Sequence, residues 1–257
     1  HRAEASSRGP QQHIPVAFPA HAALAGAYMF LANPFGILDN QIAMPKAKSA
    51  AEKALEIDAD LSEAYVAMGA IATFHEWDSA RAHHFFDKAI TLNANDVNAR
   101  MYYELALSLL DQDFDEALAQ LKVALELDPL NLLILVRTGY VYVYKYDFDT
   151  ALTCYDKIIQ IEPELAAGYH GLQDIYGIQG KYDLAIEAGE KAVKLGNEEP
   201  PFVGALGLYC GRSGNTTRAN EILNSLLDRS RKESISPFWI AVVYLGLGQL
   251  DKVFEWF

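Results

Sequence analysis

A small residue recurs along this chain at an almost constant interval of 34 or 35 residues. Four residues after most of these positions stands a large apolar residue, and three residues later comes another apolar one. These spacings place all three on one face of an α-helix, so the pattern predicts one helix per interval with that face buried. The small residues are Ala47, Ala82, Ala117, Ala151, Ala185, Ala219 and Val253.

A second cluster of apolar and small residues lies upstream of each small residue. It is clearest in Leu135–Tyr142, and Tyr65–Gly69 and Val203–Gly207 are its counterparts. Short polar turns such as Gln179–Tyr182 separate the two clusters, and prolines such as Pro129 stand between repeats. Proline has a fixed φ and no amide hydrogen, so it ends one helix and begins the next. The sequence therefore predicts helix pairs stacked on their neighbours.

The repeat resembles that of tetratricopeptide-repeat (TPR) proteins over residues 20 to 257. The resemblance implies an all-α fold, a right-handed α-α superhelix of about seven helix hairpins. We expect a linker or arm at 1–17 and the array at 18–257, with units at 18–60, 61–95, 96–129, 130–163, 164–198, 199–233 and an incomplete 234–257. The residues that carry the resemblance are Leu135, Gly139, Tyr142, Ala151, Tyr155 and Pro163, then Tyr169, Leu172, Tyr176, Ala185 and Leu195.

Several positions depart from the family pattern. Gln173 and Leu105 stand where glycine is usual, and Gly189 replaces the large residue of the second helix. Two units are one residue longer, one of them around Glu76–Asp78, and an insertion between Asn33 and Pro45 separates the first helix from its partner.

A narrower resemblance concerns the segments Met44–Lys48, Glu76–Asp78 and Ser236–Ala241. They are similar to the C-terminal TPR region of large bacterial signalling and transcription regulators, where the array follows a winged-helix or an adenylate-cyclase domain. This resemblance implies a regulatory module of a longer protein. The chain opens with His1-Arg2 instead of methionine, so we expect that the natural N-terminus lies upstream.

Charge narrows the range of partners. The net charge of −13 argues against direct nucleic-acid binding and against docking on anionic lipid. No stretch is long and apolar enough to predict a membrane span.

Cys154 and Cys210 lie two units apart, too far for a disulfide, and two reduced thiols are compatible with a cytoplasmic location.

The sequence offers little for catalysis, and we expect neither an enzyme nor a cofactor. Gly204, Gly207 and Gly211 follow no strand and precede no Lys-Ser/Thr, so close packing between helices explains them better than phosphate binding. The alternative is a metal-binding or enzymatic role at His83 and Asp87, which share a helix face. Exposed histidines are the simpler explanation.

The first helices of the pairs line the concave side of such a superhelix. The resemblance implies ligand contacts at fixed positions there, and these positions are apolar and aromatic in the middle units, with a polar end. The basic and asparagine residues that capture a C-terminal carboxylate in other members are missing, so we expect an apolar or amphipathic segment of a protein partner. The predicted groove residues are Tyr102, Val136, Tyr140, Tyr144, His170, Asp174 and Arg212.

The last helix breaks off with the apolar residues Phe254, Trp256 and Phe257. Solenoids normally end in a polar capping helix. We expect that the array continues beyond Phe257, with a homodimer through this end as the alternative. The sequence thus predicts a protein–protein interaction scaffold, whose partner is another protein or another domain of the same chain.

Overall fold

The computed structural model describes residues 17–32 and 40–256, which fold into α-helices and two π-helical turns without any strand. The predicted all-α fold is thus confirmed. The elements are α1 (Ala17–Ala32), α2 (Asn40–Ile57), α3 (Ser62–Ile71), η1 (Ala72–Glu76), α4 (Ser79–Leu92), α5 (Val97–Ala106), η2 (Leu107–Asp111), α6 (Phe114–Leu127), α7 (Leu132–Tyr144), α8 (Phe148–Ile161), α9 (Ala166–Ile178), α10 (Tyr182–Leu195), α11 (Pro200–Arg212), α12 (Thr216–Ser230), α13 (Pro237–Gly246) and α14 (Leu250–Glu255).

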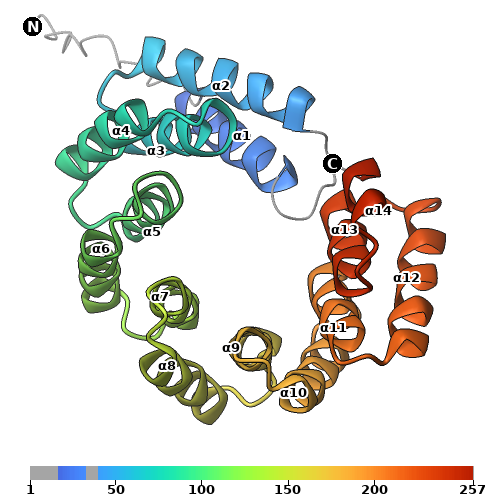
Figure 1. Ribbon diagram of the computed structural model, residues 1–257. Helices are drawn as coiled ribbons and strands as arrows, with labels where there is room; N and C mark the ends of the chain where they lie inside the picture. The colour runs from blue at the N-terminus through green and yellow to red at the C-terminus, as the bar shows by residue number, and fades with distance from the viewer. Residues whose placement is uncertain (1–16, 33–39, 257) are drawn as a thin grey trace, which may run out of the picture.

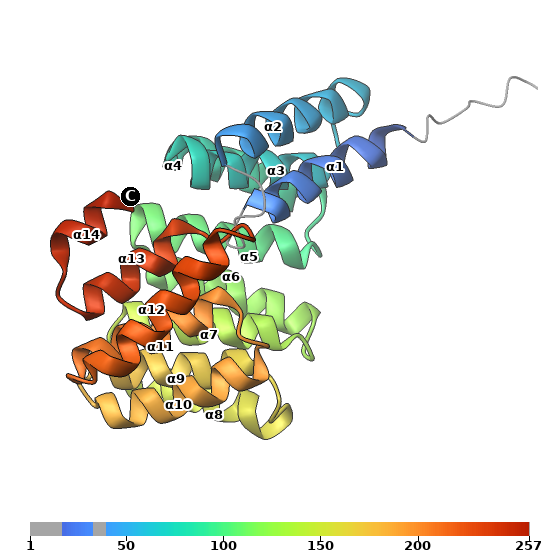
Figure 2. The same ribbon diagram turned by 90° about the vertical axis from the view of Figure 1, so that its right-hand side faces the viewer.

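The helix pairs follow one another around a curved superhelix (Figure 1). In each pair the first helix, called helix A, is followed by helix B. The A helices α5, α7 and α9 lie on the inner side and the B helices α6, α8 and α10 on the outer side. Seen from the side, successive pairs lie in layers, and α8 and α10 are farthest from the two chain ends (Figure 2). The predicted unit boundaries stay a prediction.

The repeated small residues form the contact between the two helices of a pair. All six alanines of the series have no exposed surface, whereas Val253 in the last helix is half-buried. In the pairs α3–α4 and α7–α8, the large residue four positions later reaches helix A at a glycine. A Cβ added to Gly69 would lie 2.7 Å from the Phe86 ring, and one added to Gly139 would lie 2.6 Å from the Tyr155 ring. Only glycine therefore fits beneath these rings.

The pair α9–α10 makes the same contact with the two partners exchanged. Helix A carries Gln173, fully buried, and helix B carries Gly189 where other repeats have a large residue. A Cβ added to Gly189 would lie 2.4 Å from Gln173 Nε2. The two departures seen in the sequence therefore compensate each other, because the volume missing from helix B is supplied by helix A.

The two longer units place their extra residue in a π-helical turn. The turns η1 and η2 end helix A in these units, and the N–H groups of Trp77 and Gln112 bond to carbonyls five residues earlier. The wider turn also corrects one sequence assignment. In α3, Gly69 lies eight positions after the N-cap Leu61. In α5, the residue eight positions after the N-cap Asp96 is Glu104. Glu104, and not Leu105, therefore occupies the glycine position.

The beginning of the array differs from the expectation in two places. Helix α2 starts at Asn40, so residues 40–44 belong to a helix and the expected insertion Asn33–Pro45 is shorter than predicted. Pro45 lies inside α2, beyond its first turn, where it removes one backbone hydrogen bond of the helix. Helix α1 starts at Ala17, the last residue assigned to the arm, and the rest of the arm lies outside the described residues.

The glycines of α11 are packing positions, as predicted. A Cβ on Gly204 would meet Trp239 at 3.0 Å and one on Gly207 would meet Val243 at 2.7 Å. At Gly211 the added Cβ would lie 2.4 Å from the backbone of Gly246, so α11 and α13 touch backbone to backbone.

The exchange between Gln173 and Gly189 can be tested by a double-mutant cycle. Gln173→Gly leaves a void and Gly189→Leu creates a clash, so each alone destabilises the protein. Combined, they rebuild the glycine-and-large pair of the other repeats, and we expect a coupling free energy of about 1–3 kcal/mol in urea unfolding. Gly189→Leu with the distant Gly26→Ala serves as the control. Additive losses in the Gln173–Gly189 cycle would contradict the compensation.

Candidate partner-binding groove

The predicted groove residues all lie on A helices, at the inner side of the superhelix (Figure 1). Tyr102 is in α5, His170 and Asp174 are in α9, and Arg212 ends α11. The three residues Val136, Tyr140 and Tyr144 are in α7. These residues differ in how deeply they are buried. Val136 is only 5% exposed and belongs to the core, whereas Tyr144 is 40% exposed and Arg212 is exposed.

Tyr140, His170 and Asp174 come together in one polar network across α7, α9 and α11. The Tyr140 hydroxyl lies 2.9 Å from His170 Nδ1, and the same nitrogen lies 3.6 Å from Asp174 Oδ2. Tyr209, which the sequence reasoning missed, donates its hydroxyl hydrogen to Asp174 Oδ1 at 3.3 Å. The ring of Phe202 packs edge-on against His170, with centroids 5.3 Å apart. The network links three consecutive A helices.

Burial governs the ionisation of this network. It raises the pKa of Asp174, against the lowering effects of His170 and the Tyr209 hydroxyl. Burial also raises the pKa values of Tyr140 and Tyr209, and the Asp174 charge raises both further, so both hydroxyls stay protonated at neutral pH. The polar groups predicted to face a ligand are thus engaged with one another. They link the A helices that carry the exposed residues of the candidate groove.

Exposed apolar residues occur on η2, α7 and α9, which belong to three consecutive repeats. Leu109 is 43% exposed, Leu133 53%, Tyr144 40% and Ile178 50%. Leu109, Tyr144 and Ile178 also line a cavity of about 860 Å³, which continues to the turns at the ends of η2 and α7. A second cavity of about 690 Å³ lies between α1, α3 and α5 and includes Tyr102.

Glu104 is a second buried polar feature of the A helices. It has no exposed surface, and its carboxylate accepts hydrogen bonds from Arg137 Nε at 2.8 Å and from the Ser108 hydroxyl at 3.0 Å. Burial raises the pKa of Glu104, while Arg137 and Ser108 act in the opposite direction. This ion pair joins α5 to α7. Its sequence signal is a charged residue at a position that glycine fills in other repeats.

We expect Arg137→Leu to destabilise the protein by about 3–5 kcal/mol at neutral pH, because Glu104 is left buried without its counter-charge. The folded-state pKa of Glu104 then rises further above its unfolded value. Folded protein retains a proton that unfolded protein releases, so the stability of the variant falls as pH rises between these two pKa values. Urea unfolding between pH 4 and 8 measures this slope.

The double variant Glu104→Gln with Arg137→Leu is the control for this experiment. It lacks the titrating carboxylate, so its stability relative to the wild type should lose most of the pH dependence seen in Arg137→Leu. A loss of stability in Arg137→Leu that is equal at all pH values would show that packing, and not charge burial, is the cause.

His83 and Asp87 do not form the pair that the alternative prediction required. His83 Nε2 lies 2.8 Å from Asp111 Oδ2 in η2, and its Nδ1 lies 3.4 Å from the Tyr103 hydroxyl. Ser79 donates a hydrogen bond to the same Asp111. Among the described residues, no group of three or more His, Cys, Asp or Glu side chains is arranged to hold a metal ion. Nothing in this geometry favours the metal-binding or enzymatic alternative.

The cysteines and the last helix complete the predicted features. Cys154 and Cys210 are both free thiols, and burial raises the pKa of each. Phe254 is 79% exposed and Trp256 is half-buried, whereas Phe257 lies outside the described residues. No helix within the described ranges is long and apolar enough to span a membrane.

No protein-family model matches the chain. Among curated proteins, it is 28% identical to tetratricopeptide repeat-containing protein trd-1 of Caenorhabditis elegans over 156 residues, which are 60% of this chain and 20% of that protein. It is 26% identical to the transcriptional regulator HilA of Salmonella typhimurium over 241 residues, which are 91% of this chain and 42% of that protein. The chain thus spans less than half the length of either relative.

Solved structures show the same architecture. The type IV pilus biogenesis factor PilW superposes with a TM-score of 0.65 at 15% identity, covering 89% of this chain and 99% of PilW. A tetratricopeptide repeat protein from Parabacteroides merdae superposes with a TM-score of 0.61 at 11% identity, covering 93% of this chain and 91% of that one. The chain therefore has the right-handed superhelical fold of TPR proteins, as the sequence predicts.

Proposed function

We propose that this chain is a protein–protein interaction scaffold that binds an apolar or amphipathic segment on its concave side. One observation supports the proposal: Leu109, Leu133, Tyr144 and Ile178 expose apolar surface on η2, α7 and α9 of three consecutive repeats. Exposed apolar residues that gather in one place are typical of interaction surfaces. The half-buried network of Tyr140, His170 and Asp174 links the helices that carry this surface.

The scaffold is proposed to be the regulatory part of a larger bacterial regulator. The similarity to the transcriptional regulator HilA extends over nearly the whole chain and supports this context. The partner is then a protein, including another domain of the same polypeptide. The charge of −13 is unfavourable for direct contact with nucleic acid or anionic lipid, and the proposed location is the cytoplasm.

Site-specific photo-cross-linking tests the groove. A benzophenone amino acid is placed at Leu133 or Tyr144 in the full-length protein within its own cells, and at the exposed Lys157 of α8 as the outer-face control. We expect adducts to a protein partner or to another domain from the two groove positions, and few from Lys157. Tyr144→Ala with Ile178→Ala should reduce the adducts formed at Leu133, since both side chains would contact the partner. Equal yields at inner and outer positions would refute the proposal.

The C-terminal end is a separate proposed surface for self-association. Phe254 is 79% exposed in α14, next to the half-buried Trp256. If copies associate through this end, light scattering will show a mass that rises with concentration and that Phe254→Ser lowers. A constant monomer mass at all concentrations would exclude a homodimer.

A further inference from the structure

The turns between helices A and B differ between the two halves of the array. In six of the turns one residue adopts a left-handed conformation, with φ between 54° and 87°. The last three turns use glycine there, which adopts this conformation without strain. The first three use Trp77, Gln112 and Tyr146, for which it is unfavourable.

The two aromatic side chains at these turns gain little burial in return. Trp77 is 68% exposed and Tyr146 is 75% exposed. Tyr146 packs edge-on against Phe148, with ring centroids 5.9 Å apart. Since glycine serves the same turn elsewhere in the chain, the fold does not require an aromatic residue here. Large exposed side chains in a strained conformation point to a role outside the fold.

A cavity opens beside Tyr146. Its volume is about 860 Å³, and its apolar lining includes Leu109, Phe114, Tyr144, Tyr146 and Ile178. The rings of Phe114 and Tyr144 lie 6.2 Å apart at their centroids, so the aromatic residues of two consecutive repeats meet there. Because Tyr144 and Ile178 are also groove residues, the cavity continues the proposed groove to the turn edge of the superhelix.

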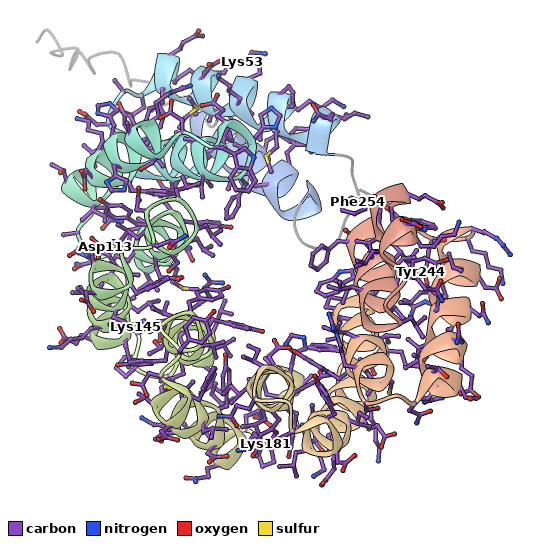
Figure 3. All side chains as sticks on the ribbon, in the orientation of Figure 1. Lys53, Asp113, Lys145, Lys181, Tyr244 and Phe254 are labelled. Carbon is purple, nitrogen blue, oxygen red and sulfur yellow. The ribbon has the colours of Figure 1, made fainter. Side chains whose placement is uncertain are left out.

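The one charged residue in the lining of this cavity is Lys145, and the two turn segments that flank the cavity are mostly acidic. The segments 111–116 and 144–149, which flank it, contain one basic residue, Lys145, which is paired with Asp115. Lys145 and Asp113 mark two consecutive turns of this edge, and Lys181 marks the next, in the glycine-turn half (Figure 3). The carboxylates of the two segments are Asp111, Asp113, Asp115, Glu116, Asp147 and Asp149.

The N-caps of helix B follow the same division. Asp78, Asp113 and Asp147 cap α4, α6 and α8, whereas Lys181, Asn215 and Gln249 stand at this position in the last three turns. Asparagine caps a helix as well as aspartate does, so capping alone does not require three carboxylates. All three of these turns therefore carry an acidic N-cap, and two of them, at Trp77 and Tyr146, also carry an aromatic residue in the left-handed conformation.

We propose that the cavity beside Tyr146 binds a cationic amphipathic segment of the protein partner. An apolar side chain of the segment enters the cavity, and lysine or arginine side chains flanking it face the carboxylates of the two turns. Complementary charge of this kind selects the partner and speeds its association. The inference rests on the proposed function, since it assigns the partner class to one end of the same groove.

The experiment uses two short fluorescent helical peptides with the same apolar face, one flanked by lysine and the other by glutamine. We expect the wild-type protein to bind the lysine peptide about tenfold more tightly, as a few exposed charge pairs can supply, with a preference that falls as salt rises. Substituting Asp113, Asp115, Asp147 and Asp149 by asparagine preserves the helix caps and should remove this preference.

A matched variant controls for net charge. Glutamine at Glu126, Glu162, Glu164 and Glu187 removes the same number of exposed carboxylates from sites outside this turn edge, and the preference should remain. Tyr146→Gly should raise the melting temperature, because the backbone strain is relieved. It should also weaken binding of the lysine peptide about tenfold. Higher stability with lower affinity distinguishes a binding residue from a structural one.

The possible failures are distinguishable. Equal affinity for the two peptides, or equal effects of the asparagine and glutamine variants, overturns the cationic partner. In that case the groove itself stands if Tyr144→Ala with Ile178→Ala weakens both peptides. If this groove variant leaves both affinities unchanged, the proposed groove fails. If neither peptide binds the wild-type protein, both proposals are overturned.

Discussion

The superhelix depends on close packing between the two helices of a pair, and in α3–α4 and α7–α8 a large side chain of helix B is seated where helix A has only glycine. Gly69 beneath Phe86 and Gly139 beneath Tyr155 show the contact at its closest. It brings the two helices of a pair together and leaves the buried alanine series as the seam between them. Tyr155 also reaches Gly171 of the next A helix, so the same side chain joins neighbouring repeats. Each unit is thereby fixed only by its neighbours, as in other solenoids.

The features of this architecture differ in how far the sequence predicts them. The helix pairs follow from the period, because a spacing of 34 residues with apolar residues on one helix face leaves few alternatives. The compensation between Gln173 and Gly189 was visible only as two separate departures. The π-helical turns were visible as one extra residue, but its position was not. That displacement moved the glycine position from the predicted Leu105 to Glu104, and hid the buried ion pair with Arg137.

The sequence predicts which helices form the candidate groove, but it does not predict how deeply each of their residues is buried. The position in the repeat tells which side of helix A a residue faces. It does not tell whether a neighbouring repeat covers it, since that depends on side chains about one repeat away. Val136 is covered in this way, and Tyr140 is drawn into the network with His170. Tyr209 and Tyr146 were missed for a related reason, although Tyr146 left a signal, an aromatic residue where later turns have glycine.

Polar contacts between A helices fix the relative orientation of successive repeats more strictly than apolar packing alone does. A hydrogen bond weakens steeply when its angle departs from linearity, whereas dispersion contacts tolerate sliding. Glu104 with Arg137 joins α5 to α7, Tyr140 with His170 joins α7 to α9, and Tyr209 with Asp174 joins α11 to α9. These contacts restrict the rotation between successive repeats along the middle of the array. The curvature of the groove is therefore fixed in the same repeats that expose its apolar residues.

The two halves of the array use their turns differently, and the difference fits the partner-binding role proposed above. In the C-terminal half, glycine turns carry no side chain, and α11 meets α13 backbone to backbone at Gly211 and Gly246. Such contacts bring the helix backbones close together and leave no room for side chains between them. In the preceding repeats two turns hold an exposed aromatic residue, Trp77 or Tyr146, in a strained conformation beside acidic residues. Glycine would relieve this strain, so its retention fits the proposal that this edge is shaped for a partner and not for the fold alone.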